Sequence, residues 1–98
     1  MQQQQQAFAG TVVIVTGAGH GIGRAIAERF GQAGASVVAN DIRQQVDEVA
    51  EAIKRTGGAA LSVVADVSQK AEVDRLFDAA LERFGDVNVL VNNAALLG

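Results

Sequence analysis

Residues 16–23 read Thr-Gly-Ala-Gly-His-Gly-Ile-Gly and lie between an apolar run at residues 12–15 and an amphipathic pattern that starts near Ile22. The glycines allow the backbone to turn sharply from a strand into a helix and to approach a ligand closely. The helix that follows would point its unpaired N–H groups and positive dipole end at the same turn. The stretch therefore predicts a site for an anionic group, most simply a phosphate. The alternative is a tight turn without a ligand.

A second feature is the acidic residue that ends the next apolar run. Residues 36–40 (Ser-Val-Val-Ala-Asn) predict a strand, and Asp41 follows it. A strand, a glycine loop, a helix and a second strand that ends in an acid about twenty residues further on form the βαβ pattern that binds dinucleotides. The Asp41 carboxylate would accept hydrogen bonds from both hydroxyls of an adenosine ribose and would repel a 2′-phosphate. The pattern predicts NAD rather than NADP, although Asp41 could also simply solvate or cap the strand end.

The glycine spacing departs from the general G-x-G-x-x-G fingerprint. Counting from Gly17 places Ile22 where the last glycine would stand. The pattern T-G-x-x-x-G-x-G does fit, with Thr16, Gly17, Gly21 and Gly23 at its fixed positions. In this spacing the chain resembles the short-chain dehydrogenase/reductase family.

Two later motifs extend the resemblance over nearly everything after residue 10. Asp66-Val67 follow the third predicted strand, and residues 92–95 (Asn-Asn-Ala-Ala) follow the fourth. The usual family form of the last motif is Asn-Asn-Ala-Gly, so Ala95 departs from it, and its methyl group would slightly crowd the ribose side of a cofactor. The resemblance implies an oxidoreductase that transfers a hydride between NAD(H) and an alcohol or carbonyl substrate.

The resemblance also implies roles for individual residues. Gly17 and Gly21 would allow the pyrophosphate to approach, and Gly23 would let the first helix pack closely. Asp66 would meet the adenine amino group, although capping of the third helix explains it nearly as well. Asn93 would touch the adenosine ribose, mainly through its backbone. The expected cofactor-binding residues are Gly17, His20, Gly21, Ile22, Gly23, Asp41, Ile42, Asp66, Val67, Asn93 and Ala94.

Two basic residues bear on the choice between the cofactors. Some relatives carry a basic residue at the position of His20 that faces the phosphate of NADP. With Asp41 present, we interpret His20 as a spectator or a neutral neighbour of the phosphate. The side chain of Arg43 would weaken the exclusion of NADP if it curled back toward Asp41.

The pattern as a whole predicts an α/β, Rossmann-like fold with three αβα layers. Continuous apolar strands are typical of a parallel sheet that helices cover on both faces. Right-handed crossovers predict four strands in the order 3-2-1-4, with a ligand at the switch point between the first and fourth strands. The expected strands span residues 11–16, 36–40, 60–65 and 88–91, and the expected helices span residues 22–33, 44–55 and a stretch that Ser68 would N-cap and Gly85 would end.

Composition excludes several other classes of function. The net charge of −3, without a lysine- or arginine-rich stripe, argues against nucleic acid or a membrane surface as a partner. There is no cysteine, and the single His20 cannot form a metal site alone. No apolar stretch approaches the ~20 residues of a membrane span, and residues 1–30 lack the features of a signal peptide, so we expect a cytoplasmic protein.

Residues 1–10, rich in glutamine, are expected to form a flexible tail before an NAD-binding half-domain at residues 11–98.

The chain has no tyrosine, whereas the general acid/base of the family is the tyrosine of a Tyr-x-x-x-Lys motif assisted by a serine. We therefore expect the cofactor-binding half of an oxidoreductase, truncated before its catalytic segment and inactive alone. It would self-associate through the apolar edge of the fourth strand, or pair with the missing C-terminal half. A stand-alone nucleotide-binding module without chemistry is the alternative, and a methyltransferase that uses S-adenosylmethionine is a distant third.

Overall fold

Strands and helices alternate along residues 7–94, the part of the chain that the computed structural model describes. The elements are β1 (Val12–Val15), α1 (Gly21–Gln32), β2 (Ser36–Asp41), α2 (Val46–Arg55), β3 (Ala59–Val64), α3 (Lys70–Phe84) and β4 (Val89–Val91). Their order is the predicted one, and only the ends of the elements differ from the expected bounds.

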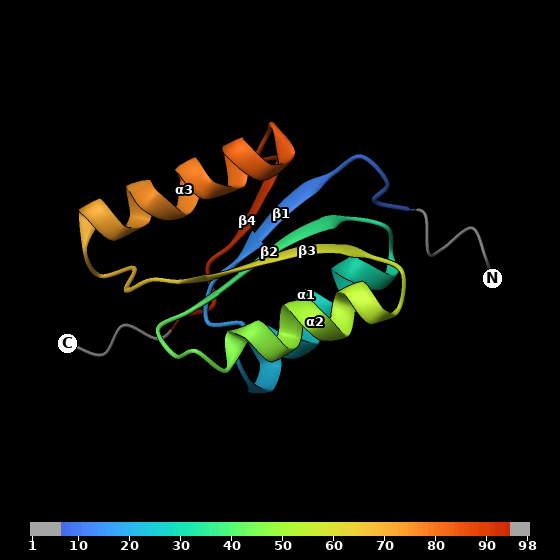
Figure 1. Cartoon of the computed structure of the whole chain (residues 1–98), viewed down its shortest axis with the longest axis horizontal. Helices are drawn as coiled ribbons and strands as arrows, with labels where there is room; N and C mark the ends of the chain where they lie inside the picture. The colour runs from blue at the N-terminus through green and yellow to red at the C-terminus, as the bar shows by residue number, and fades with distance from the viewer. Residues whose placement is uncertain (1–6, 95–98) are drawn as a thin grey trace.

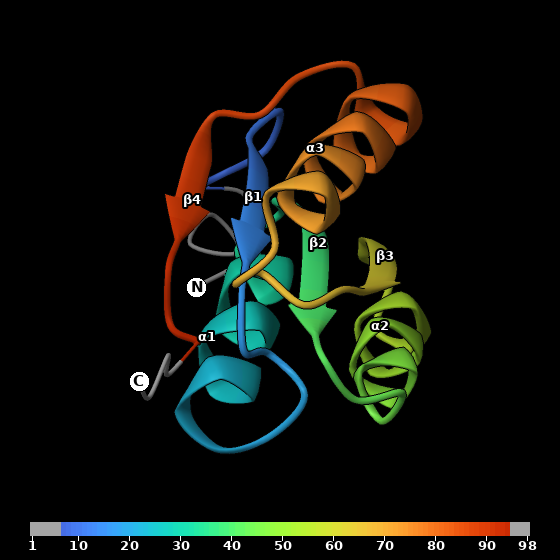
Figure 2. The same cartoon turned by 90° about the vertical axis from the view of Figure 1, so that its left-hand side faces the viewer.

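The strands form one parallel sheet in the order β3-β2-β1-β4, which confirms the predicted order (Figure 2). In the centre of the sheet, Ile14 of β1 lies opposite Val38 of β2 on one side and Leu90 of β4 on the other. Between β1 and β4 the chain passes through α1, β2, α2, β3 and α3. Because β1 and β4 pair in parallel, their carboxyl ends are neighbours although they are far apart in the sequence.

Helices cover both faces of the sheet, as predicted: α1 and α2 pack on one face and α3 packs on the other (Figure 1). Successive strand residues point to opposite faces, so each strand contributes to two cores. Val13 and Val15 belong to the core under α1 and α2, together with Ile53. Ile14 belongs to the core under α3, where it joins Leu76. The apolar runs are continuous because both faces of each central strand are buried.

The start of α3 differs from the prediction that Ser68 would cap it. Gln69 occupies the N-cap position of this helix and makes no capping hydrogen bond with its side chain. The hydroxyl of Ser68 instead donates to Oδ1 of Asp66 at 2.7 Å. A nearby carboxylate is a strong local acceptor, and it therefore competes with the helix for this hydroxyl. The other end of α3 is as predicted, since Gly85 lies at the C-cap with a φ of 82°.

Residues 7–10, which the sequence grouped with the tail, make defined contacts with the end of α1. The N–H of Phe8 donates to the carbonyl of Ala33 at 2.8 Å. The rings of Phe8 and Phe30 meet edge to face with centroids 5.2 Å apart. The expected glutamine-rich part of the tail, residues 2–6, lies outside the described residues.

β4 is an edge strand of the described sheet, since it pairs with β1 alone there. Its central residue, Leu90, is 49% exposed. Between residues 7 and 94, no helix is long and apolar enough to cross a membrane.

Candidate functional site

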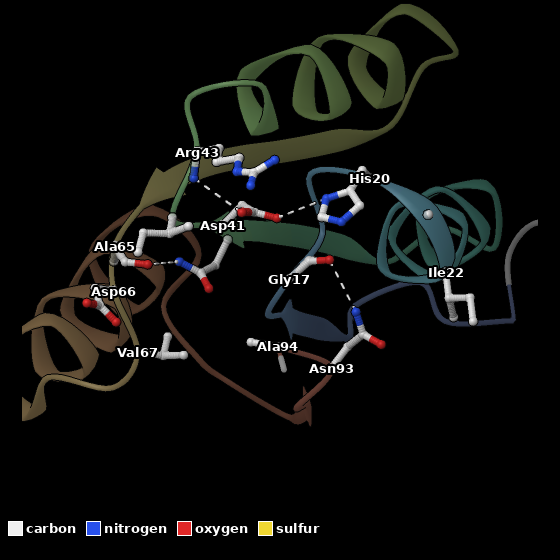
Figure 3. A pocket seen from close by; sticks show the side chains of 13 residues that line it. Gly17, His20, Ile22, Asp41, Arg43, Ala65, Asp66, Val67, Asn93 and Ala94 are labelled. Atoms are coloured by element: carbon white, nitrogen blue, oxygen red, sulfur yellow. Dashed lines mark hydrogen bonds and ion pairs between the residues drawn. The ribbon is translucent and has the colours of Figure 1, made fainter. Parts of the chain in front are cut away.

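A cavity of about 380 Å³ opens at the carboxyl ends of the strands, where the chain leaves β1, β2, β3 and β4 (Figure 3). The lining residues come from the loop between β1 and α1 and from the segments that follow the other three strands. They are Gly17, His20, Gly21, Ile22, Asn40, Asp41, Ile42, Arg43, Ala65, Asp66, Val67, Asn93 and Ala94. This is the switch point of the sheet, the place where the sequence predicted a ligand.

The structure brings all but one of the expected cofactor-binding residues to this cavity. The exception is Gly23, which is buried at the start of α1 behind the loop. A Cβ atom on Gly23 would overlap the carbonyl oxygen of Gly17 and the side-chain amide of Asn93. Gly23 therefore lets the helix, the loop and the end of β4 approach one another and does not face a ligand.

The glycine loop ends at the N-terminus of α1, and no side chain of that helix end neutralises its positive dipole. Gly17 and Gly21 have φ angles of 65° and 58°, in the left-handed region that favours glycine. His20 precedes α1 in an extended conformation and gives no capping hydrogen bond from its side chain, and the first turn of the helix holds no acidic residue. The first N–H groups of a helix have no partner within it, so they and the positive dipole end are available to an anion in the cavity.

Asp41 is the buried acid of the site, with 6% of its surface exposed. Its Oδ2 accepts the N–H of Gly19 at 2.8 Å, and its Oδ1 accepts the N–H of Arg43 at 3.2 Å. Nδ1 of His20 lies 3.9 Å from Oδ2, beyond hydrogen-bond distance. An ionised carboxylate has about four acceptor positions, so Asp41 can accept two further hydrogen bonds from a ligand.

The two basic residues singled out in the sequence flank Asp41. Figure 3 shows His20 on one side of the carboxylate and the side chain of Arg43 along the same rim of the cavity. The Arg43 guanidinium thus lies where a further anionic group beside Asp41 would meet it.

Asp66 fixes the turn between β3 and α3 and also lines the cavity. Its Oδ1 accepts both the hydroxyl and the N–H of Ser68, at 2.7 and 3.0 Å. These bonds, led by the one from the hydroxyl, hold the pKa of Asp66 below its usual value. The N–H of Asp66 donates to Glu72 Oε1 at 3.1 Å, which ties the turn to the first part of the helix. Helix initiation and ligand contact are therefore compatible roles for this one residue.

Thr16 joins the glycine loop to the segment after β4. Its Oγ1 accepts the N–H groups of Asn93 and Ala94, at 2.9 and 3.1 Å. The side-chain amide of Asn93 donates to the carbonyl of Gly17 at 3.2 Å (Figure 3). Because the N–H of Asn93 is occupied by Thr16, the carbonyl is the backbone group of Asn93 that remains for a ligand.

Asn40 is a site residue that sequence reasoning missed. It is 1% exposed, and its Nδ2 donates to the carbonyls of Val63 and Ala65 at 3.0 and 3.1 Å. These bonds hold the end of β3 against β2 and set the position of the segment that carries Asp66. The available signal was an amide side chain that ends an otherwise apolar run directly before Asp41.

Comparison with known proteins identifies a family for this arrangement. The family model described as short chain dehydrogenase matches residues 11–98. The chain is 48% identical over 91 residues to glucose 1-dehydrogenase 2 of Bacillus subtilis, which covers 91% of this chain and 35% of that protein. It is also 48% identical over 89 residues to 3beta-hydroxysteroid dehydrogenase 1 of Eggerthella lenta, covering 89% of this chain and 34% of that protein.

Solved structures give the same result for the fold. A hydroxysteroid dehydrogenase from Escherichia coli matches with a TM-score of 0.90 and 40% identity, covering 97% of this chain and 41% of that chain. A short chain dehydrogenase from Mycobacterium avium matches with a TM-score of 0.89 and 39% identity, covering 94% and 35% of the two chains. The present chain thus spans about a third of the length of the curated relatives it matches.

Proposed function

Because the chain belongs to the short chain dehydrogenase family, we propose that its cavity binds the adenosine and pyrophosphate parts of NAD(H). In this proposal the chain is the cofactor-binding portion of an oxidoreductase that transfers a hydride between NAD(H) and an alcohol or carbonyl group. The observation that carries it is the shared location of two features: the Asp41 carboxylate and the N-terminus of α1 open into one cavity.

The N-terminus of α1 supports binding of the pyrophosphate. The loop before it places the backbone of Gly17 and Gly21 at the wall of the cavity, without side chains that would keep a ligand away. A phosphate there would accept hydrogen bonds from the free N–H groups of the first helical turn and would be stabilised by the helix dipole. No acidic residue of the first turn would oppose it.

Asp41 supports binding of the adenosine ribose. Two backbone N–H groups hold its carboxylate in place, and the two acceptor positions that remain match the two hydroxyl donors of an unmodified ribose. A 2′-phosphate would instead bring its negative charge against a largely buried carboxylate, which is unfavourable at low dielectric. This contrast favours NAD over NADP.

The adenine would lie between two apolar side chains at the rim of the cavity, Ile42 and Val67. Ile42 is 61% exposed, so its side chain is accessible to a ligand in the cavity. Asp66 beside them offers a carboxylate oxygen for the exocyclic amino group, since the bonds from Ser68 go to Oδ1 alone.

NADP is the second candidate, and the observation in its favour is the pair of basic residues at the rim. His20 and Arg43 both line the cavity next to Asp41, and a 2′-phosphate that displaced the carboxylate would meet both. Whether the chain binds NAD or NADP more tightly thus depends on whether the Asp41 carboxylate stays in its present position.

The hydride-transfer step is proposed for the whole protein and not for these 98 residues alone. They hold no tyrosine, so the acid/base group that the family uses is not among them. The names of the two relatives refer to glucose and to a hydroxysteroid, which are both alcohols, and this supports an alcohol or carbonyl substrate. A coding sequence that continues past residue 98 with a serine and a Tyr-x-x-x-Lys motif would support the enzyme, whereas a stop codon there would favour a binding module without chemistry.

Calorimetric titration of the chain with NAD and with NADP tests the proposal. We expect NAD to bind more tightly, and Asp41→Ala to weaken its binding by roughly 1–3 kcal/mol, the loss expected for hydrogen bonds to a charged acceptor. Asp78→Ala is the matched control, because it removes an exposed acid on α3. Equal or tighter NADP binding by the unmodified chain would overturn the role of Asp41, and a folded chain that binds neither dinucleotide would overturn the function.

A further inference from the structure

Gly19 stands at one of the positions that the pattern T-G-x-x-x-G-x-G leaves open, yet it makes the closest contact with the buried acid of the site. Its N–H donates to Oδ2 of Asp41 at 2.8 Å, and this bond is buried. A Cβ atom added to Gly19 would lie 2.7 Å from Oδ2, 3.0 Å from Cγ and 3.2 Å from Cβ of Asp41. The space that a side chain at position 19 would need is therefore filled by Asp41.

The backbone conformation is not what requires glycine here. Gly19 is absent from the glycines with positive φ, which include its neighbours Gly17 and Gly21. Position 19 therefore does not require the left-handed conformation, and the contact with Asp41 is the obstacle that the structure shows for alanine there. The effect of a substitution at Gly19 would thus be transmitted through one neighbouring side chain.

A methyl group at position 19 would require the Asp41 side chain to shift. The distance to Oδ2 is shorter than real Cβ contacts, and the distances to Cγ and Cβ are tight. Its second oxygen is held by the N–H of Arg43 at 3.2 Å, and the residue is buried. A side chain at position 19 would therefore break one or both backbone hydrogen bonds of the carboxylate and shift it away from its present position.

We propose that Gly19 is a positioning residue for cofactor selection: it holds the Asp41 carboxylate where that group accepts the ribose hydroxyls of NAD and excludes the 2′-phosphate of NADP. This inference rests on the proposed function. Any larger residue at position 19 displaces the carboxylate and leaves His20 and Arg43 as the charged or polar groups that a 2′-phosphate meets at this rim. The preference then shifts toward NADP although no residue that contacts the ribose has been replaced.

The binding test compares Gly19→Ala, Asp41→Ala and the double variant with the unmodified chain. We expect Gly19→Ala to reduce the preference for NAD over NADP by about tenfold, close to the effect of Asp41→Ala. In the Asp41→Ala background, Gly19→Ala should change the preference by less than about twofold, because the partner through which it acts is gone. Equal effects of Gly19→Ala in both backgrounds would overturn the proposal.

A folding measurement on the same variants covers the case in which Gly19→Ala alone unfolds. The substitution Asp41→Ala removes Oδ2 and Cγ, the two closest atoms, and leaves only the Cβ of residue 41 at 3.2 Å. The double variant should therefore regain a cooperative thermal transition close to that of Asp41→Ala. If the double variant were as unstable as Gly19→Ala, the contact with Asp41 would not be the cause and the proposal would fail.

A third measurement needs no ligand. Amide hydrogen exchange followed by NMR should show Gly19 protected in the unmodified chain and about tenfold or more less protected in Asp41→Ala. The N–H of Gly57, which donates to the carbonyl of Lys54 at 3.0 Å, is the control that should not change. Unchanged exchange at Gly19 would show that the bond to Asp41 is not formed in solution.

The outcomes also separate this inference from the proposed function. A chain that binds neither NAD nor NADP overturns both. A chain that prefers NAD, and whose preference Gly19→Ala leaves intact, supports the function and overturns the role of Gly19.

Discussion

The hydroxyl of Thr16 accepts the backbone N–H of Asn93 at 2.9 Å, although the two residues are 77 positions apart in the sequence. The same oxygen accepts the N–H of Ala94 at 3.1 Å. Thr16 is 4% exposed and directly follows β1, whereas the other two residues follow β4. One side chain thus joins the glycine loop to the segment after β4, which also lines the cavity.

Replacing Thr16 by valine keeps the shape of the side chain and removes this acceptor. Two backbone N–H groups would lose their partner near the floor of the cavity, and we expect a loss of about 1–3 kcal/mol in the free energy of unfolding. Urea denaturation measures this loss. Thr56→Val is the control, because the Thr56 hydroxyl bonds to Ile53 of its own helix at 3.0 Å and lies at an exposed helix end. Equal losses in the two variants would contradict the role of Thr16.

The glycines of the loop should respond to alanine for different reasons. Gly23 has no positive φ but is packed against Gly17 and Asn93, so we expect Gly23→Ala to prevent proper closure of the loop and to abolish dinucleotide binding. Gly21 has a φ of 58° with open space around it, so Gly21→Ala should cost a backbone strain of about 1–3 kcal/mol in stability. Its methyl group at the cavity wall should weaken dinucleotide binding without abolishing it. We thus expect Gly23→Ala to reduce stability and dinucleotide binding more than Gly21→Ala does. Thermal unfolding and calorimetry of both variants measure these losses, and smaller losses for Gly23→Ala would disprove the prediction.

Stability at acidic pH should depend on Asp47, one of the two acids in the first turn of α2. Hydrogen bonds from the hydroxyl of Ser62 and from the amide of Gln44 hold the pKa of Asp47 below its usual value. A lowered pKa in the folded state means that this contribution is present above the pKa of the unfolded chain and is lost as the pH falls through the folded value. The loss is expected below about pH 4.

The variant Ser62→Ala removes the leading cause of that shift. It should melt at a lower temperature than the unmodified chain at pH 7, and the difference should shrink as the pH is lowered toward 2, because protonation of Asp47 removes the charged acceptor of this hydrogen bond. Ser36→Ala is the control, since the Ser36 hydroxyl makes no hydrogen bond within residues 7–94, and its effect should not vary with pH. If Ser62→Ala lowered the melting temperature by the same amount at both ends of this pH range, the prediction would be contradicted.

The edge strand β4 should make the 98-residue chain self-associate. Leu90 is 49% exposed on this short apolar edge, and unpaired edges of this kind recruit further strands. Leu90→Lys should reduce the association, because a charged side chain opposes edge pairing. Leu81→Lys on α3, where Leu81 is 47% exposed, should reduce it less. Sedimentation velocity measures this, and a monomeric unmodified chain with a cooperative melting transition would refute the prediction.

The fold could be predicted because each element is specified locally. The apolar runs, the helical stripes and the glycines between them determine strand and helix, and the handedness of crossovers then leaves one order for the strands. The error at Ser68 has the same local origin. A serine before a helix is a good N-cap, but Asp66, two residues earlier, offers its hydroxyl a charged acceptor that the pattern alone does not rank above the helix.

The residues around the cavity could be predicted to a similar extent, since they follow strand ends that the topology brings to one edge of the sheet. The roles of Asn40 and Gly19 were not predicted. Asn40 reads as part of an apolar strand, and its importance lies in two carbonyls of β3 that only the folded sheet brings near. Gly19 reads as one more flexible position in a glycine loop.

The sequence by itself determined the order and type of the elements, the family and the edge of the sheet at which a ligand belongs. These follow from periodicity, from the spacing of glycines and from the position of acids after strands, which are all properties of short segments. Only the tertiary structure decided which atoms meet across those segments. Thr16 with Asn93, and Gly19 with Asp41, are contacts between distant parts of the chain, and hydrogen bonds and steric exclusion depend on differences of a few tenths of an ångström that no pattern of residues encodes.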